Sequence, residues 1–296
     1  MKLLNFYEKT DEKNIICLGR FDGLHLGHKT LIYKGVELRN QLNNDTKLAV
    51  FMFHGSEPIS PFKRIFTFRE SVKKFKEEPV DTIIVAPETE KFFLLSKDTF
   101  LEYLKTNFNP VAIICGEDYT FGFNREGNKD YLKKYCKKNG IDFYCLPLIY
   151  KGGEKISSSR IKELLKEGKV DVANDLLGDN YFIEGPVVRG RGVGKKIGFP
   201  TLNMEIPKEK APLKIGVYAT LAKYDGEIHE AITNYGSAPT FGDDKVLMET
   251  HVIGTKCDLY GLDVRIDFKK FIREDKKFNN VKELIEQLTK DMSYND

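Results

Sequence analysis

The sequence predicts two domains of different class: an α/β domain built on a parallel sheet, then a small antiparallel β-barrel with a closing helix. In the first half, short apolar runs alternate with segments of helical period, which is typical of a parallel sheet covered on both faces. From about residue 180 the helical period stops, and short β-rich segments separated by glycine-containing turns follow. We therefore expect a boundary near Gly178–Asp179, which divides the chain into residues 1–178 and 179–296.

Length and composition limit the classes of function. A chain of 296 residues is long enough for two hydrophobic cores. A hydrophobic content of 41% and a charged content of 31% are ordinary for a globular protein. The net charge of +3 is too small to indicate a dedicated nucleic-acid binder. Because no apolar run reaches the length of a membrane helix and the N-terminus lacks a signal-peptide core, we expect no membrane partner. The expected partners are small-molecule substrates, and the oligomeric state is left open.

The five cysteines are scattered, and none has CxxC spacing. Cys17 and Cys115 lie inside strand-like apolar runs. We therefore expect buried, reduced thiols in a cytoplasmic protein.

The first half contains five apolar runs that read as buried strands: residues 14–18, 47–53, 80–85, 111–115 and 141–146. Helical periodicity is expected between them at about residues 29–41, 67–78, 96–108 and 129–139. Thr67 and Glu70 have the spacing of a capping box at the start of the second helix. In such sheets ligands bind at the carboxyl ends of the strands. The loops after the first and fourth strands are therefore the candidate ligand-binding loops.

The first of these loops reads GRFDGLHLGH at residues 19–28. Its glycines leave no side chains in the way, so backbone N–H groups can approach a ligand closely. The helix that follows offers unpaired N–H donors and a partial positive charge, which suit phosphate. His25 and His28 are two polar donors that the same turn can direct at one group.

Two other interpretations of this turn are a chance or zinc-binding HxxH pair and a dinucleotide-binding loop. An HxxH pair is often incidental, or is half of a zinc site that needs two more ligands. No cysteine lies close in sequence, although the fold could bring one near. A GxGxxG dinucleotide loop does not fit, because the glycine spacing differs.

The pattern FDGxHxGH resembles the nucleotide-binding turn of the HxGH nucleotidylyltransferases, and more narrowly that of the bacterial FMN adenylyltransferases. The resemblance implies a Rossmann-like nucleotidylyltransferase domain. It also implies that the side chains of His25 and His28 act on the triphosphate, and that the nucleotide is bound by Gly19, Phe21, Asp22 and Gly23. A tRNA-synthetase-like enzyme shares HxGH, but the sequence lacks an anticodon-reading region.

The loop after the fourth strand reads GEDYTFGFNREG at residues 116–127. From the residues alone, a surface turn with its aromatic side chains tucked down is an equally good interpretation. The pattern resembles the GxDFxFG segment of the same family, which implies that Asp118 contacts a substrate.

The stretch KISSSRI at residues 155–161 opens an amphipathic helix. An N-cap explains one serine but not three with flanking cations. Hydroxyls, helix N–H groups and two cations form a second phosphate clamp. The stretch resembles the ISSTRIR motif of the family, which implies that the nucleotide is also bound by Lys155, Ser158, Ser159 and Arg160. Lysine in place of arginine keeps the charge but loses the bidentate fork.

Two features depart from the family pattern. The proline-histidine-proline loop after the second strand is replaced by FHGSEP at residues 53–58. Arg20 stands where a small or amide residue is more usual. Since the resemblance places flavin or adenine nearby, these changes bear on affinity and flavin selectivity more than on the reaction.

The second half contains β-rich segments at residues 181–188, 215–224, 228–235, 246–253 and 262–268. A helix is expected at residues 281–292. The densest motif, GRGVGKKIGFPTLN at residues 190–203, is not a Walker A loop, because Arg189 and Lys196 occupy its glycine and Ser/Thr positions. A flexible hairpin tip would explain the glycines and lysines, but not the GFPTxN that follows. The hydroxyl of Thr201 and the amide carbonyl of Asn203 are hard oxygen ligands suited to Mg²⁺.

This motif resembles the GxxxGFPTxN signature of riboflavin kinases, which implies a riboflavin kinase-like barrel with Mg²⁺ at Thr201 and Asn203. The resemblance also implies that ATP is bound in the barrel by Gly192, Gly194, Lys195, Gly198 and Pro200. Residues 216–219 and 234–241 are similar to further segments of that family.

The triplet Glu249-Thr250-His251 resembles the E-x-H element of the family, whose glutamate is the general base. The role of Glu249 as the base is favoured because it lies in an apolar strand, where burying a carboxylate without a function would cost desolvation free energy. Ile253-Gly254 departs from a frequently acidic position.

Together the resemblances span residues 14–291 and imply a bifunctional enzyme of flavin cofactor biosynthesis. One half phosphorylates riboflavin to FMN with ATP and Mg²⁺, and the other adenylylates FMN to FAD with release of pyrophosphate. Two alternatives stay open at this point: a single-activity kinase whose first half is weakened by the altered 54–58 loop, and a non-enzymatic flavin-binding module.

Overall fold

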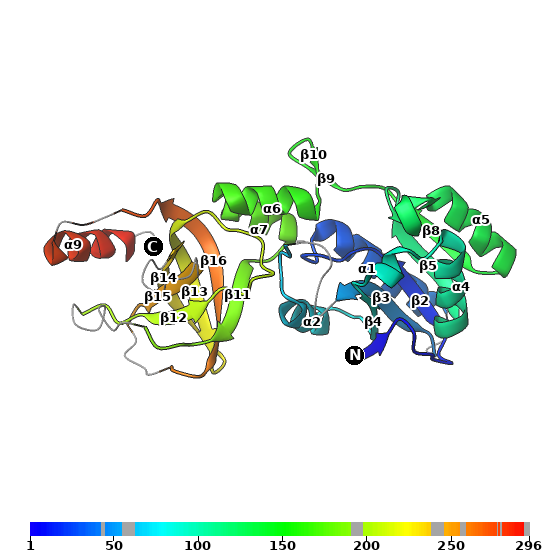
Figure 1. Ribbon diagram of the computed structural model, residues 1–296, viewed down its shortest axis with the longest axis horizontal. Helices are drawn as coiled ribbons and strands as arrows, with labels where there is room; N and C mark the ends of the chain where they lie inside the picture. The colour runs from blue at the N-terminus through cyan, green and yellow to red at the C-terminus, as the bar shows by residue number, and fades with distance from the viewer. Residues whose placement is uncertain are drawn as a thin grey trace. The chain divides into compact units, whose positions relative to one another are not determined.

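The computed structural model describes residues 1–42, 45–54, 63–190, 198–237, 246–254, 259–276, 278 and 280–292 (Figure 1). The chain forms two compact units. The first comprises residues 1–62 and 68–157, and the second comprises residues 63–67 and 158–296. The functional boundary at Gly178–Asp179 stays a prediction.

Within its described residues, the first unit holds a six-stranded sheet in the order β1-β4-β3-β2-β5-β8. Every neighbouring pair is parallel, which confirms the predicted sheet. The strands are β1 (Lys2–Asn5), β2 (Asn14–Leu18), β3 (Lys47–His54), β4 (Thr82–Pro87), β5 (Pro110–Gly116) and β8 (Asp142–Leu146).

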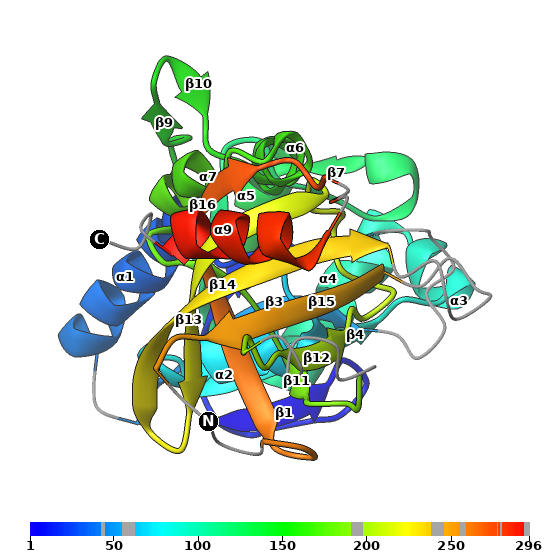
Figure 2. The same cartoon turned by 90° about the vertical axis from the view of Figure 1, so that its left-hand side faces the viewer.

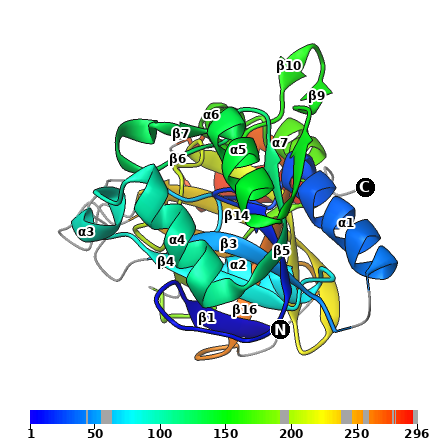
Figure 3. The same ribbon diagram turned by 90° about the vertical axis from the view of Figure 1, so that its right-hand side faces the viewer.

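Helices cover both faces of this sheet (Figure 3). One hydrophobic core contains side chains from the helices α4 (Lys97–Phe108) and α5 (Lys129–Asn139). The other contains side chains from α1 (Leu26–Gln41) and α2 (Phe68–Lys76). An ion pair of 3.2 Å between Lys29 and Glu78 links α1 to the residues after α2.

Strand β2 shows why these apolar runs form a doubly covered sheet. Ile16 and Leu18 pack into the core beneath α4 and α5, whereas Ile15 and Cys17 pack into the other core. Since successive side chains of a strand point to opposite faces, a run buried on both faces must be apolar throughout. Cys17 and Cys115 are buried free thiols, as predicted, and burial raises the pKa of the Cys17 thiol.

The unpredicted elements of this unit are short. The strand β1 pairs with β4 but is mostly exposed, so it has no buried apolar run. The helix α3 has only four residues, Glu90–Phe93. Two small hairpins complete the unit: β6 (Thr120–Phe121) with β7 (Gly127–Asn128), and β9 (Tyr150–Lys151) with β10 (Glu154–Lys155).

The described part of the second unit holds a six-stranded antiparallel sheet in the order β11-β16-β13-β14-β15-β12 (Figure 2). An isolated bridge between Val188 and Asn203 joins its two ends, so the sheet forms a nearly closed barrel, as predicted. The strands are β11 (Tyr181–Pro186), β12 (Leu202–Glu205), β13 (Gly216–Tyr224), β14 (Glu227–Ser237), β15 (Val246–Val252) and β16 (Asp263–Arg273).

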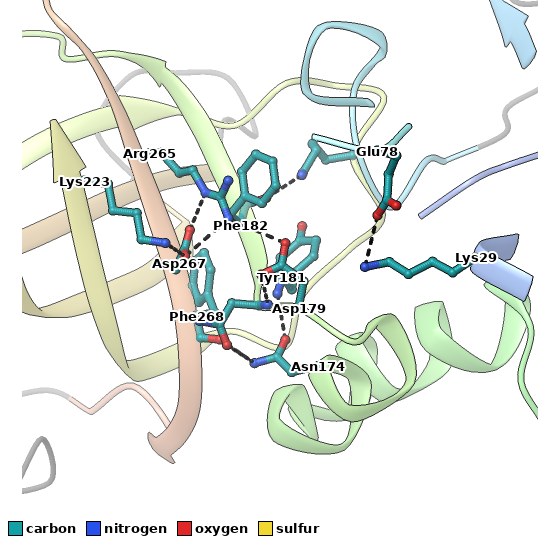
Figure 4. A network of polar contacts seen from close by, with 12 residues as sticks. Lys29, Glu78, Asn174, Asp179, Tyr181, Phe182, Lys223, Arg265, Asp267 and Phe268 are labelled. Atoms are coloured by element: carbon teal, nitrogen blue, oxygen red, sulfur yellow. Dashed lines mark hydrogen bonds and ion pairs between the residues drawn. The ribbon is translucent and has the colours of Figure 1, made fainter. Parts of the chain in front are cut away.

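In the part of this unit that the structure describes, three helices accompany the barrel: α6 (Ser158–Glu167), α7 (Val170–Leu177) and the predicted closing helix α9 (Val281–Met292). Figure 4 shows how α7 is joined to the strands. Asn174 of α7 donates a hydrogen bond to the carbonyl of Phe268 at 2.8 Å and accepts one from the N–H of Tyr181 at 2.7 Å. These bonds satisfy backbone groups on two strands, which fixes the helix against the sheet.

A buried carboxylate lies beside these bonds. Asp267 has no exposed side-chain surface, and its oxygens lie 2.6 Å from both Arg265 and Lys223. The Arg265 guanidinium also lies 3.8 Å from the centre of the Phe182 ring (Figure 4). Because an unpaired buried charge is strongly unfavourable, the two cations stabilise Asp267 in this position.

A short segment from the middle of the first half, residues 63–67, packs within the second unit. The N–H of Arg64 donates to the carbonyl of Glu209 at 2.6 Å. The ammonium group of Lys210, whose residue is only 4% exposed, lies 5.0 Å from the centre of the Phe66 ring. Phe66 is itself buried, so this segment contributes to the core of the barrel unit.

Candidate active sites

The turn between β2 and α1 has an unusual backbone. Phe21 and Leu24 have φ angles of 49° and 47°, and Gly23 has a φ of 93°. Non-glycine residues adopt such left-handed angles at an energetic cost, and they persist where packing holds them, frequently at functional sites. Phe21 is 1% exposed and Leu24 is 3% exposed, so burial of their side chains offsets the strain.

The two histidines of the turn lie face to face. Their ring centres are 3.7 Å apart with 16° between the planes. Nδ1 of His25 accepts a hydrogen bond from the backbone N–H of His28 at 3.3 Å, so His25 is the N-cap of α1. Because Nδ1 acts as the acceptor, the proton of a neutral His25 ring lies on Nε2. This N–H is therefore the donor that His25 can offer to an anion.

Burial keeps both rings uncharged. It lowers the pKa of His25 to about 4. Burial, with a smaller contribution from His25, also lowers the pKa of His28 well below its usual value. Nδ1 of His28 has no hydrogen-bond partner within the described residues, and its ring packs 4.7 Å from that of Phe21. The pair thus offers neutral hydrogen-bonding groups in an apolar setting.

Two glycines of the turn make room for side chains. A Cβ on Gly19 would lie 3.1 Å from the Phe21 ring, and one on Gly27 would lie 3.2 Å from the His25 ring. The smallness of these residues thus positions Phe21 and His25. Their predicted contacts with a nucleotide stay predictions, and a side chain as buried as Phe21 has little surface left for a ligand.

The loop after β5 contributes a charged side chain that acts on His25. Lys155 forms an ion pair with Asp118, so a residue of the serine-rich motif meets one of the GEDYTFG loop. Both charges act on His25: Asp118 raises its pKa and Lys155 lowers it, as minor causes beside burial. Asp22 is a further charge that raises the pKa of His25. The structure therefore places four predicted site residues in one electrostatic neighbourhood.

Two of the three aromatic residues of that loop turn inward, whereas Phe123 is exposed. Phe121 is buried, and its ring stacks 5.7 Å from that of Tyr119. The simple interpretation as a turn with tucked aromatics is therefore correct for these two side chains. Gly116 has room only for a hydrogen, since a Cβ would lie 3.2 Å from an oxygen of Asp118.

The residues that depart from the family pattern surround the end of β3. The guanidinium of Arg20 lies 5.8 Å from the centre of the Phe53 ring. The His54 ring stacks on that of Phe68 at 3.9 Å with 14° between the planes. Residues 55–58 of the altered loop lie outside the described residues.

The serine-rich motif opens a helix as predicted, since α6 begins at Ser158. Ser158, Ser159 and Arg160 are counted with the second unit, whereas Lys155 belongs to the first. Their shared role as a phosphate clamp stays a prediction.

The candidate kinase residues are brought together by strand register. Asn203 of β12 lies opposite Glu249 of β15, and Glu249 lies opposite Asn234 of β14. Directly opposite residues of antiparallel strands share a face, with Cβ atoms about 5 Å apart. We call Asn203, Glu249 and Asn234 the polar row. Thr201 lies directly before β12, two residues from Asn203.

The metal-ligand candidate Asn203 is tightly held. It is 4% exposed, and a Cβ on Gly190 would lie 2.2 Å from its amide nitrogen. Any larger residue at position 190 would displace this side chain. Other glycines of this motif were assigned to ATP binding, so this role of Gly190 was missed.

The reason given above for Glu249 was wrong, because its side chain is exposed while its neighbours Met248 and Thr250 are buried. Successive side chains of β15 alternate between buried and exposed, so the carboxylate of Glu249 has no desolvation penalty from burial. The assignment of Glu249 as the general base is instead supported by its position in the polar row, opposite Asn203.

His251 anchors the GFPT segment, a role that sequence reasoning missed. Its Nδ1 lies 2.9 Å from the carbonyl of Pro200, and its ring lies 5.2 Å from that of Phe199. Because a carbonyl only accepts, Nδ1–H is the donor. The E-x-H spacing was the available signal, since it puts Glu249 and His251 on one face of the strand.

Part of the predicted kinase site lies outside the described residues: Gly192, Gly194 and Lys195, together with residues 238–241. Gly198 is described, with a φ of 87°. Among the described residues, no three His, Cys, Asp or Glu side chains gather as a metal group. None of the described helices combines the length and the hydropathy needed to span a membrane.

Comparison with known proteins matches each half to a family. Residues 7–160 match the family described as FAD synthetase, and residues 177–295 match the riboflavin kinase family. A bifunctional riboflavin kinase/FMN adenylyltransferase from Listeria monocytogenes is 31% identical over 96% of this chain and 92% of its own. One from Bacillus subtilis is 30% identical over 94% and 90%.

A solved structure from Streptococcus pneumoniae, named a macrolide-efflux protein, shares the whole fold. It is 27% identical, covers 99% of this chain and 98% of its own, and has a TM-score of 0.89. Two family matches in tandem and relatives that match end to end lead to one conclusion: this chain belongs to the family of bifunctional riboflavin kinase/FMN adenylyltransferases.

Proposed function

We propose that this chain makes FAD from riboflavin in two ATP-dependent reactions, one in each half. The barrel phosphorylates riboflavin to FMN, and the α/β unit adenylylates FMN to FAD with release of pyrophosphate. The observation that carries the proposal is that each half has its own constellation: the paired histidines in the first unit and the polar row in the second.

In the kinase reaction, Glu249 accepts the proton of the ribityl 5′-hydroxyl as that oxygen attacks the γ-phosphorus of ATP, and ADP leaves as the bond to the β,γ-bridging oxygen breaks. Thr201 and Asn203 fit a Mg²⁺ ion, because they offer hard oxygen donors two residues apart and Asn203 lies opposite Glu249. Such an ion, when bound, neutralises phosphate charge. Gly190 leaves space for the Asn203 amide, and His251 contacts the carbonyl of Pro200 directly before Thr201, so the fold constrains both candidate ligands.

ATP binding in the barrel is assigned to the glycine-rich segment: Gly192, Gly194, Lys195, Gly198 and Pro200. Backbone N–H groups of such a segment can approach phosphate oxygens closely, and the lysine adds a positive charge.

In the adenylyltransferase reaction, the FMN phosphate attacks the α-phosphorus of ATP and pyrophosphate leaves. The phosphate is already a nucleophile, so the protein contributes position and charge stabilisation. Nε2–H of His25 donates to the triphosphate, with His28 stacked behind it. Lys155 supplies positive charge beside Asp118.

Three further residues, Ser158, Ser159 and Arg160, are assigned to the leaving pyrophosphate, on the basis of the serine-rich motif at the start of α6. Gly19, Asp22 and Gly23 are assigned to the backbone cradle of the nucleotide. We place the enzyme in the cytoplasm, where ATP is available and where the four cysteines that the structure describes would stay free thiols.

Product analysis tests the proposal directly. Riboflavin with ATP and Mg²⁺ should yield FMN and then FAD, and supplied FMN should yield FAD and pyrophosphate. If FMN is formed but never converted, the altered 54–58 loop has left a kinase alone. If ATP is consumed with neither flavin, the chain is a binding module and the proposal is wrong.

A further inference from the structure

The polar row has a third member that the reaction above does not use. Asn234 lies opposite Glu249 in the strand register, and its Oδ1 is buried without a hydrogen-bond partner among the described residues. A buried acceptor left unpaired is costly, and native structures pair nearly all such atoms. The oxygen is therefore suited to a donor that arrives with a ligand.

A glycine is a near neighbour of this oxygen along the same face of the strand. Gly236 follows Asn234 by two residues and shares its face of β14. A Cβ placed on Gly236 would lie 3.8 Å from Oδ1 of Asn234, which is ordinary contact distance. No side chain at position 236 covers this acceptor, and a Cβ there would also lie 3.9 Å from Cγ2 of Ile215.

The order of the strands decides which substrate the oxygen meets. Across β12, β15 and β14 the row runs from Asn203 through Glu249 to Asn234, with about 5 Å between neighbouring strands. Asn203 would hold the Mg²⁺ that neutralises the ATP phosphates, so the alcohol substrate would approach Glu249 from the side of Asn234. The next residue in register beyond Asn234 is the apolar Val217, whose side chain offers no competing donor.

We propose that Oδ1 of Asn234 accepts a hydrogen bond from a secondary hydroxyl of the ribityl chain of riboflavin. The bond holds the chain so that its terminal hydroxyl faces Glu249, which makes Asn234 a specificity-determining residue of the kinase site. This inference rests on the proposed function, because it needs riboflavin as the acceptor alcohol.

The test compares two flavins on the full-length chain. One is riboflavin, and the other carries a 5-hydroxypentyl side chain, which keeps the terminal hydroxyl but lacks the secondary ones. Asn234→Leu is expected to lower kcat/KM for riboflavin about tenfold and to leave kcat/KM for the analogue within about twofold. The KM for ATP should not change.

The conservative variant Asn234→Asp keeps the acceptor oxygen and should keep the preference for riboflavin. Its added carboxylate beside Glu249 should raise the pKa of that base and move the acid limb of the kinase pH profile upward. FAD formation from supplied FMN, measured on the same samples, reports that the rest of the chain is intact.

Equal losses on both flavins, or a change confined to the KM for ATP, would overturn the assignment of Asn234 while leaving the kinase reaction in place. If the unmodified protein phosphorylates neither flavin, the proposed function fails and the inference fails with it. The two failures are therefore distinguishable.

Discussion

The two sites hold their polar groups in opposite ways. His25 and His28 are buried and neutral, and one short turn with left-handed residues positions them. Glu249 is exposed, and it meets Asn203 only because two distant strands pair in a fixed register. The first site thus depends on local backbone geometry, and the second depends on the topology of the barrel. Damage to one should leave the other working.

The largest expected effect is the loss of the kinase base. Glu249→Gln keeps the shape of the side chain but cannot take a proton, so FMN formation from riboflavin should fall by about 10²–10⁴-fold. FAD formation from supplied FMN should persist, as measured by chromatography of the products. A variant that still makes FMN at the normal rate would remove Glu249 from the role of base.

The histidine pair should give the converse result. Losing a donor to developing phosphate charge, as in His25→Ala, should slow FAD formation by about 10²–10³-fold and spare FMN formation. The same change removes an N-cap, which costs about 1 kcal/mol. His25→Asn should restore stability without restoring the rate. If FMN formation stopped as well, the two reactions would not have separate sites.

The pH dependence of stability should distinguish the units further. Folding lowers the pKa of His25 from its ordinary 6.5 to about 4, so between these values the unfolded chain binds more protons. The stability of the first unit should therefore be full above pH 6.5 and should fall by up to about 3 kcal/mol as the pH drops towards 4.

Denaturant unfolding at a series of pH values measures this slope. A His25→Phe/His28→Phe double variant keeps apolar rings and should lose most of the slope. Identical slopes in the two proteins would contradict the burial of neutral imidazoles.

The smallest effect is expected at Gly190. In Gly190→Ala the new methyl group would displace the Asn203 amide, and the kinase should need about tenfold more Mg²⁺ for half-maximal rate. Gly185→Ala is the matched control, since its Cβ would meet only Met204 at 3.6 Å. A Mg²⁺ titration of FMN formation makes the comparison. Equal curves for the two variants would show that the position of Asn203 does not matter.

The contrast between a local turn and a non-local strand register also explains which features the sequence could predict. Strand β2 and helix α5 could be predicted because a buried apolar run and a helical period of apolar residues are local signals. Helix α5 begins and ends where expected, at Lys129 and Asn139. The histidine turn was visible for the same reason, as a continuous motif.

Features that depend on non-local pairing were not predicted. The contact of His251 with Pro200 and the neighbourhood of Glu249 and Asn234 arise from register, which no local period encodes. The wrong reason for Glu249 has the same origin: an apolar composition was taken as burial, although alternation leaves one face exposed. Strand β12 was hidden inside a motif that was interpreted only for its ligands.

The position of residues 63–67 in the second unit limits how this enzyme can be divided into separately expressed parts. The chain passes into the second unit there, returns, and enters it again after residue 157, so one cut cannot release both parts whole. A barrel expressed from Ser158 onward would leave the aromatic surface of Phe182 without the Phe66 ring, 4.7 Å away in the intact chain. Dividing the gene at the end of its first half would therefore leave the kinase part incomplete.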